Sequence, residues 1–128
     1  MNIGEAARTS GVSAKMIRHY EAIGLIPSVA RTAGGYRIYD TADIHALRFI
    51  RHARDLGFPL ADLDGLLRLW RDRSRSSGEV KKLALAHIDT LDRKIAELQA
   101  MRATLRQLAD RCHGDDRPDC PILEGLAG

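Results

Sequence analysis

Aromatic residues, cysteines and long apolar runs are all scarce in this sequence. Aromatic residues make up 5% of the 128 residues, so a core has to be built mainly from leucine, isoleucine, valine and alanine. No apolar run approaches the about 20 residues of a membrane-spanning helix, and the first residues lack the basic-then-apolar order of a signal peptide. We therefore expect a cytoplasmic protein with no membrane segment.

Motifs of catalysis are missing as well. We find no glycine-rich phosphate loop, no HExxH motif and no nucleophile–base constellation, and the two cysteines lack Cys-x-x-Cys spacing. A chain of 128 residues is too short for a (β/α)₈ barrel of about 250 residues. It has room for one domain, or for one small domain plus an extended element. We predict that the protein is not an enzyme.

The positive charge lies in the first part of the chain. Residues 1–75 carry 12 Lys and Arg against 8 Asp and Glu, whereas residues 76–128 carry 8 against 9, which gives the net charge of +3. A base-rich first part favours contact with nucleic acid, although a mild surplus is also common in proteins that bind none.

The first 26 residues have the pattern of two short helices joined by a turn. The Ser10-Gly11 pair interrupts the first helical pattern, and Ser13 can cap a second helix. On this second helix Lys15 and Arg18 lie three residues apart, on a face away from the apolar residues. The pattern predicts a helix-turn-helix with a basic outer face.

Residues 31–75 add a hairpin and two more helices. Gly34-Gly35 is a turn signal within an alternating segment, which predicts a small β-wing over residues 31–39. Asp40 can open a third helix through about residue 56, and Pro59 the first turn of a fourth, with Trp70 on its inner face. We therefore expect a winged helix-turn-helix domain over residues 1–75.

The third predicted helix carries an arginine at every third position. These arginines form a basic stripe whose role is open between a solvated surface and phosphate contact; they are Arg48, Arg51 and Arg54.

A long helix follows a polar hinge over residues 71–78. Ser76 and Glu79 have capping-box spacing, and apolar residues then recur every three or four positions to about residue 109. About 33 helical residues span about 50 Å, and so narrow an apolar seam needs a partner helix. The sequence predicts a dimerisation helix over residues 76–110, with a symmetric homodimer as the simplest assembly.

The last segment, residues 111–128, holds both cysteines. Gly114 and Pro118 favour a turn between Cys112 and Cys120, and Pro121 can open a short helix that favours a thiolate at Cys120. A closed zinc site normally has four donors, so two thiolates fit a monovalent d¹⁰ ion better. A metal site, two incidental cysteines and a redox pair all remain open from the spacing alone.

Four stretches together resemble the MerR family of transcriptional regulators, and within it the copper-efflux branch of CueR-like and HmrR-like sensors. They are MNIGEAARTSGVSAKMIRHYE, GGYRIYD, IRHARDLGF and CHGDDRPDCPIL. The resemblance implies a mainly α-helical fold in which the winged helix-turn-helix binds promoter DNA. It also implies that the long helix pairs antiparallel with its twin and that the C-terminal loop holds the effector.

The resemblance also implies roles for particular residues. Cys112 and Cys120 would be the metal ligands, and Ser77 would lie beside the metal site, where divalent-metal members place a further cysteine. The implied DNA contacts are Lys15, Arg18 and Tyr20 on or beside the recognition helix, and Tyr36 and Arg37 on the wing. For Tyr20 and Tyr36, core packing is an equal alternative. His19 replaces the usual aromatic residue, and His113 adjoins a ligand.

The resemblance finally implies a homodimeric activator of copper-detoxification genes that senses Cu(I), with Ag(I) or Au(I) as alternatives. It would distort promoter DNA so that RNA polymerase can engage it. A zinc or mercury sensor on the same scaffold and a thiol redox regulator are the competing hypotheses.

Overall fold

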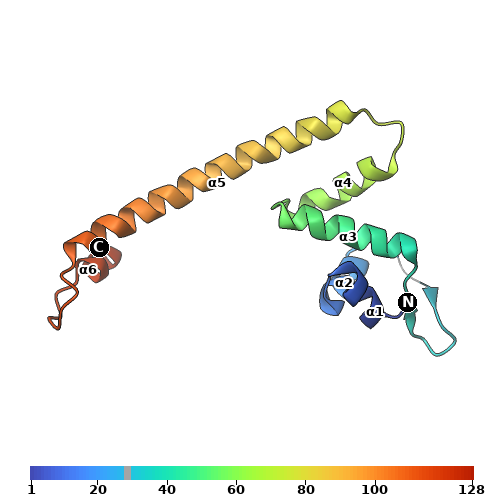
Figure 1. Cartoon of the computed structure of the whole chain (residues 1–128), viewed down its shortest axis with the longest axis horizontal. Helices are drawn as coiled ribbons and strands as arrows, with labels where there is room; N and C mark the ends of the chain where they lie inside the picture. The colour runs from blue at the N-terminus through green and yellow to red at the C-terminus, as the bar shows by residue number, and fades with distance from the viewer. Residues whose placement is uncertain (28–29) are drawn as a thin grey trace. The chain divides into compact units, whose positions relative to one another are not determined.

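The chain is described by a computed structural model that covers residues 1–27 and 30–128. It forms two compact units, Met1–Val80 and Lys81–Gly128. The fold is mainly helical, as predicted (Figure 1). The elements are α1 (Ile3–Ser10), α2 (Ala14–Ala22), β1 (Ala30–Arg31), β2 (Arg37–Ile38), α3 (Thr41–Asp55), α4 (Leu60–Arg71), α5 (Ser77–Arg111) and α6 (Pro121–Ala127).

Local sequence signals set the ends of the first two helices. Asn2 accepts a hydrogen bond from the backbone N–H of Glu5 and caps α1, and Gly11 ends that helix in the left-handed conformation with φ of 75°. Ser13 caps α2 by accepting from the N–H of Met16 at 3.2 Å. The predicted helix-turn-helix is therefore built by caps that the sequence already displays.

The start of α3 is a reciprocal capping box. The Asp40 side chain accepts from the Asp43 N–H, and the Asp43 side chain accepts from the Asp40 N–H, each at 2.9 Å. The bond from the Asp43 backbone holds the pKa of the Asp40 carboxyl below its usual value. Burial, helped by the neighbouring Asp40 charge, raises the pKa of Asp43. The box fixes the point at which the chain leaves the wing and enters α3.

The wing is a minimal antiparallel hairpin. Ala30 of β1 pairs with Ile38 of β2, and Arg31 pairs with Arg37. The turn is closed by a bond from the Gly35 N–H to the Thr32 carbonyl at 2.9 Å, with Gly35 at φ of 83°. This confirms the hairpin predicted from the Gly34-Gly35 pair.

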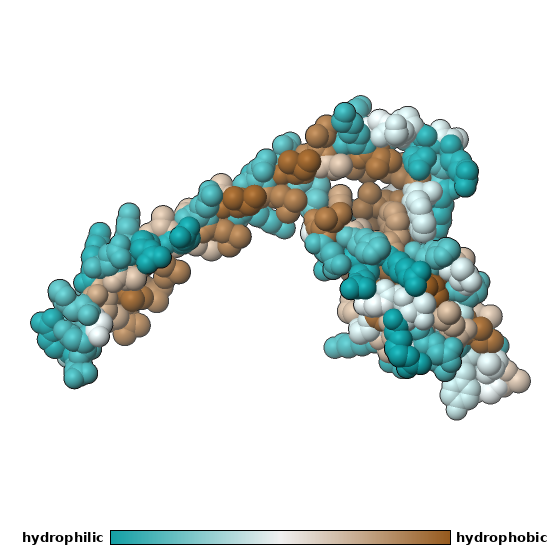
Figure 2. Space-filling view, viewed as in Figure 1, coloured by the Kyte–Doolittle hydropathy of each residue, from teal (hydrophilic) through white to brown (hydrophobic). Residues whose placement is uncertain are grey.

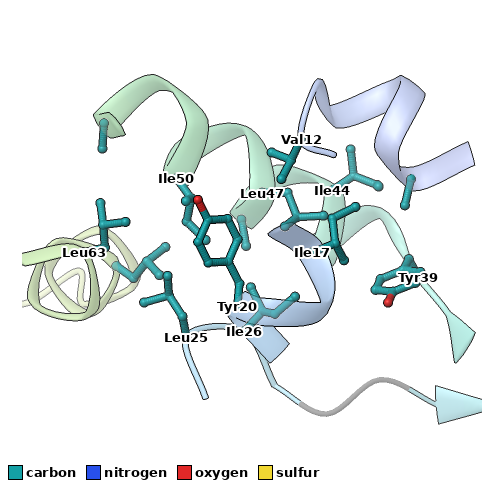
Figure 3. Packing of buried hydrophobic residues seen from close by; sticks show 14 residues of the cluster. Val12, Ile17, Tyr20, Leu25, Ile26, Tyr39, Ile44, Leu47, Ile50 and Leu63 are labelled. Atoms are coloured by element: carbon teal, nitrogen blue, oxygen red, sulfur yellow. The ribbon is translucent and has the colours of Figure 1, made fainter. Parts of the chain in front are cut away.

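The core of the first unit lies between α1, α2, α3 and α4. Figure 3 shows buried aliphatic side chains of these helices, and of the segments that follow α1 and α2, gathered around the Tyr20 ring. The largest fully buried side chains are Tyr39, Ile17, Ile26, Leu47, Ile50, Leu63 and Leu67. Truncating such a leucine to alanine typically costs about 2–5 kcal/mol of folding stability, so this core contributes much of the stability of the first unit.

Two details of α4 differ from the prediction. Pro59 occupies the N-cap position instead of the first helical turn. Trp70, predicted to point inward, is 42% exposed, and one face of its ring stacks on Phe49 with ring centroids 4.5 Å apart. The last turn of α4 extends past the buried leucines, so the helix period brings Trp70 to the edge of the core.

The long helix of the second unit ends two residues later than predicted, at Arg111. Its apolar side chains lie exposed along the helix in the single chain, where Figure 2 shows hydrophobic residues over α5. They are Leu83, Leu85, Ile88, Ile95, Leu98, Met101 and Leu105. A stripe of this size is too apolar to remain in water, which supports the predicted partner helix.

Candidate DNA interface and cysteine loop

Helix α2 presents a polar face to solvent and buries the opposite face. Lys15, Arg18 and His19 are exposed, whereas Ile17 and Tyr20 are buried. Tyr20 is 5% exposed and packs in the core. Of the two interpretations that the sequence leaves open for this side chain, DNA contact and core packing, the structure therefore shows core packing. The ring packs inward because it lies three residues after Ile17, on the same side of the helix.

Tyr36 stands at the tip of the wing and is 75% exposed. Its ring lies against Gly34, where a β-carbon would be 3.4 Å from the nearest ring carbon. The Tyr36 N–H donates to the Thr32 hydroxyl oxygen at 3.2 Å. Core packing, the alternative for Tyr36, therefore does not describe this residue, and its phenol is free to donate to an oxygen outside the chain.

Arg37, the second predicted wing contact, is half-buried and ion-paired. Its Nε lies 2.9 Å from Oε2 of Glu21 on α2, and the Glu21 side chain is 10% exposed. The Tyr39 hydroxyl donates to the same carboxylate oxygen at 3.4 Å. Nothing in the sequence marks Glu21 as a functional residue, since an acidic residue at the end of a basic helix has no local signal of burial.

The arginine stripe of α3 makes contacts within the chain. Arg48 donates through Nε and Nη2 to the carbonyl of Thr9, at 3.3 and 3.0 Å. Arg54 donates to the Phe58 carbonyl at 3.1 Å, and Arg51 lies 3.9 Å from Asp55. These bonds satisfy carbonyls near helix ends, which gives the stripe a structural role beside any phosphate contact.

The cysteine loop connects α5 and α6. Both cysteines are free and half-buried, and they flank the loop at Cys112 and Cys120. Cys120 is the N-cap residue of α6, which begins at Pro121, as predicted. Gly114 has φ of 65°, which lets the chain reverse between them.

An ion pair closes the tip of this loop. Arg117 donates from Nε to Asp115 at 2.9 Å, and its backbone N–H donates to the other carboxylate oxygen at 3.0 Å. These hydrogen bonds hold the pKa of Asp115 below its usual value. The cysteines are thus joined by a loop with its own internal structure.

The donor chemistry of the loop fits a low-coordinate ion. Over residues 1–27 and 30–128, no group of three or more His, Cys, Asp or Glu side chains could hold a metal ion. His113 is exposed, and Ser77 is the exposed first residue of α5. Two thiols without a third donor suit a monovalent soft cation, which accepts two thiolates, better than zinc.

Matches to known proteins cover nearly the whole length of the chain. The family model for MerR HTH regulatory proteins matches residues 1–70, and the one described as MerR, DNA binding matches residues 44–108. The chain is 61% identical to heavy metal-dependent transcription regulator 2 of Rhizobium meliloti (strain 1021), covering 99% of this chain and 86% of that protein. It is 41% identical to the regulator CueR of Salmonella typhimurium, covering 100% and 93%.

A solved structure agrees with the sequence matches. The regulator PbrR691 of Ralstonia metallidurans CH34, in complex with lead(II), superposes with a TM-score of 0.81 at 34% identity, over 98% of each chain. Within the part of the chain that the structure describes, we find no helix with the length and apolar character of a membrane span. The chain therefore belongs to the MerR family of transcription regulators, non-enzymatic proteins that bind promoter DNA as homodimers.

Proposed function

We propose that this regulator senses Cu(I) through Cys112 and Cys120. The observation that carries the proposal is the pair of free, half-buried thiols at the two ends of one loop, with no third donor grouped beside them in the described residues. Cu(I) would supply two thiolate bonds there, and the complex would keep one negative charge. A divalent ion in the same place would need further donors to complete its coordination.

The relatives support this direction. A relative that is 61% identical to this chain is named a heavy metal-dependent regulator, and a second relative, 41% identical, is CueR. Ser77 stands where the resemblance places an extra cysteine in divalent-metal members, and a hydroxyl is a poor ligand for soft ions. Ag(I) and Au(I) share the coordination preference of Cu(I), so they belong to the same proposal.

In the proposed response, the DNA contacts come from α2 and from the wing. Lys15 and Arg18 reach the DNA from the exposed face of α2, and Tyr36 and Arg37 hold the backbone from the wing. The ion acts by binding one protein–DNA arrangement more tightly than another, and it can shift their populations only by that difference. The favoured arrangement distorts the promoter, so that RNA polymerase engages it in the cytoplasm and transcribes detoxification genes.

An anaerobic titration tests the metal site. The unaltered protein should bind about one Cu(I) per chain, and Cys112→Ser or Cys120→Ser should abolish tight binding. His113→Ala, which changes the neighbouring side chain without removing a thiol, is the matched control and should retain the site. Unchanged affinity in both serine variants would overturn the assignment.

A divalent sensor is the second candidate, because a relative that is 34% identical over 98% of the chain was solved with lead(II). In vitro transcription from the cognate promoter separates the two. We expect activation by Cu(I) at free concentrations where Pb(II), Zn(II) and Hg(II) are inactive. Activation by a divalent ion at lower free concentration than Cu(I) would favour the second candidate.

A further inference from the structure

Glu21 is an acidic residue buried between the recognition helix and the wing. Its side chain is 10% exposed, and it lies near the end of α2 (Ala14–Ala22). The carboxylate is contacted by the Nε of Arg37 at 2.9 Å and by the Tyr39 hydroxyl at 3.4 Å. A carboxylate with so little access to water is costly unless it is paired, so these contacts are required by its position.

The geometry of the arginine matters for DNA binding. The Nε of Arg37 lies 2.9 Å from Oε2 of Glu21 in an ion pair whose N–H is not aligned for a hydrogen bond, and the Arg37 side chain remains 31% exposed. Guanidinium is a rigid planar fork with five N–H donors, so an ion pair that keeps Nε beside the carboxylate restricts where the terminal nitrogens can lie. An arginine held in this way loses less conformational entropy when it binds a phosphate than a free one does.

The partner residue Tyr39 is itself firmly held. It is among the fully buried side chains, and its backbone exchanges two hydrogen bonds of 2.7 Å with Met1. Burial, followed by the charge of Glu21, raises the pKa of the Tyr39 phenol, so the hydroxyl keeps its proton and donates. The carboxylate therefore has one fixed neutral donor and one cation.

We propose that Glu21 is a positioning residue for the wing. By holding Arg37, it sets the orientation of the wing guanidinium relative to α2, so that backbone contact from the wing and base contact from α2 occur in one register. Glu21 touches no DNA in this arrangement and acts through Arg37. The proposal builds on the DNA-binding function of the family and is independent of the metal.

Binding to two DNA duplexes tests it. One duplex is selected by the unaltered protein from a random-sequence library, and the other is an unselected random duplex. Glu21→Gln should lower the preference for the selected duplex about 10-fold, or about 1.4 kcal/mol, because α2 is no longer held in register over the bases when the wing contact is misdirected. The matched control Asp55→Asn removes one negative charge from an exposed side chain and should change binding to both duplexes by the same factor.

A second variant separates position from charge. Glu21→Asp keeps the charge but shortens the side chain by one methylene, so it should lose preference as Glu21→Gln does. Thermal unfolding of each variant is measured alongside, because loss of preference in a fully folded protein is not expected from a merely structural role.

A double-mutant cycle decides whether Glu21 acts through Arg37. In an Arg37→Gln background, Glu21→Gln should change the preference by less than about twofold. An equal loss in both backgrounds would overturn the proposal. So would a gain in affinity for the selected duplex larger than that of Asp55→Asn, since it would mean that Glu21 competes with phosphate for Arg37.

Discussion

Gly125 of α6 lies so close to Leu108 of α5 that a side chain at residue 125 would have to displace the Leu108 methyl groups. A β-carbon there would lie 2.7 Å from Leu108 Cδ2 and 3.1 Å from Cδ1. Glycine thus lets the short helix lie directly on the long one. Because Cys120 is the N-cap residue of α6, the seating of this helix also sets the position of that thiol.

Gly125→Ala should lift α6 from α5 and expose Cys120. We expect the Cys120 thiol, half-buried in the unaltered protein, to react several-fold faster with an alkylating reagent in the metal-free state. The matched control is Gly65→Ala, because Gly65 is a helical glycine with no atom within 4 Å of the added carbon. Shortening the neighbour in Gly125→Ala/Leu108→Ala should restore the slow rate. Equal rates in all variants would show that this contact does not seat the helix.

Local signals explain why much of the fold was predictable. Ser13 and the Asp40–Asp43 pair cap their helices through hydrogen bonds to residues three positions away. Gly11 adopts the left-handed backbone conformation, which glycine reaches easily because it has no side chain. Such features depend on neighbours in the chain, and a sequence displays them directly. The end of the cysteine loop is also predictable from local sequence, because Pro121 begins α6 and proline is favoured at the first position of a helix.

Features that depend on distant neighbours were not predictable. Arg48 bonds to Thr9 and Arg37 pairs with Glu21, and both pairs are separated by many residues in the chain. Tyr20 could be assigned to DNA or to the core only once the packing around α2 was known. The sequence limits which side chains can face outward. Tertiary packing then decides which of these side chains remain available for contact with DNA.

Gly11→Ala should destabilise the first unit more than Gly24→Ala. Both glycines have a left-handed backbone, with φ of 75° and 77°, so each substitution carries about 1–2 kcal/mol of strain. At Gly24 nothing lies within 4 Å, whereas at Gly11 a β-carbon would lie 2.8 Å from Cζ of Arg51. Chemical denaturation measures the difference, and adding Arg51→Ala should remove it. Equal losses for the two alanines would contradict the crowding at Gly11.

Arg48→Gln should lower the free energy of unfolding, with little effect on the salt dependence of DNA binding. Its guanidinium satisfies the Thr9 carbonyl in the last turn of α1, and a net hydrogen bond of this kind contributes about 0.5–1.5 kcal/mol. Urea unfolding should show a loss in that range. The slope of log affinity against log salt should stay nearly constant, whereas loss of a phosphate contact would reduce it by about 0.9. Lys15→Gln, which removes an exposed cation of α2, is the comparison and should reduce the slope.

Acid should loosen the tip of the cysteine loop. Hydrogen bonds from Arg117 lower the pKa of Asp115 in the folded protein. A lowered native pKa means that the contact stabilises the loop above the ordinary carboxyl pKa of about 3.9 and loses this effect as the pH falls through the native value. In Arg117→Gln the Asp115 pKa should rise toward its ordinary value, as followed by carboxyl NMR. Lys94→Gln removes a cation from the middle of α5 and should leave the titration in place.

Arg18→Ala should weaken binding to the preferred DNA sequence more than binding to random DNA, whereas Lys15→Ala should weaken binding to both more equally. Both side chains are exposed on α2, but only arginine has the planar fork that matches the edge of guanine with two bonds. Loss of a base contact typically costs about 1–3 kcal/mol on the preferred sequence, whereas loss of a phosphate contact weakens binding on all sequences alike. Affinities on a selected and a random duplex at several salt concentrations measure both effects. A uniform loss for Arg18→Ala would assign this residue to the DNA backbone, and the register of α2 in the groove would then have to be set by other side chains.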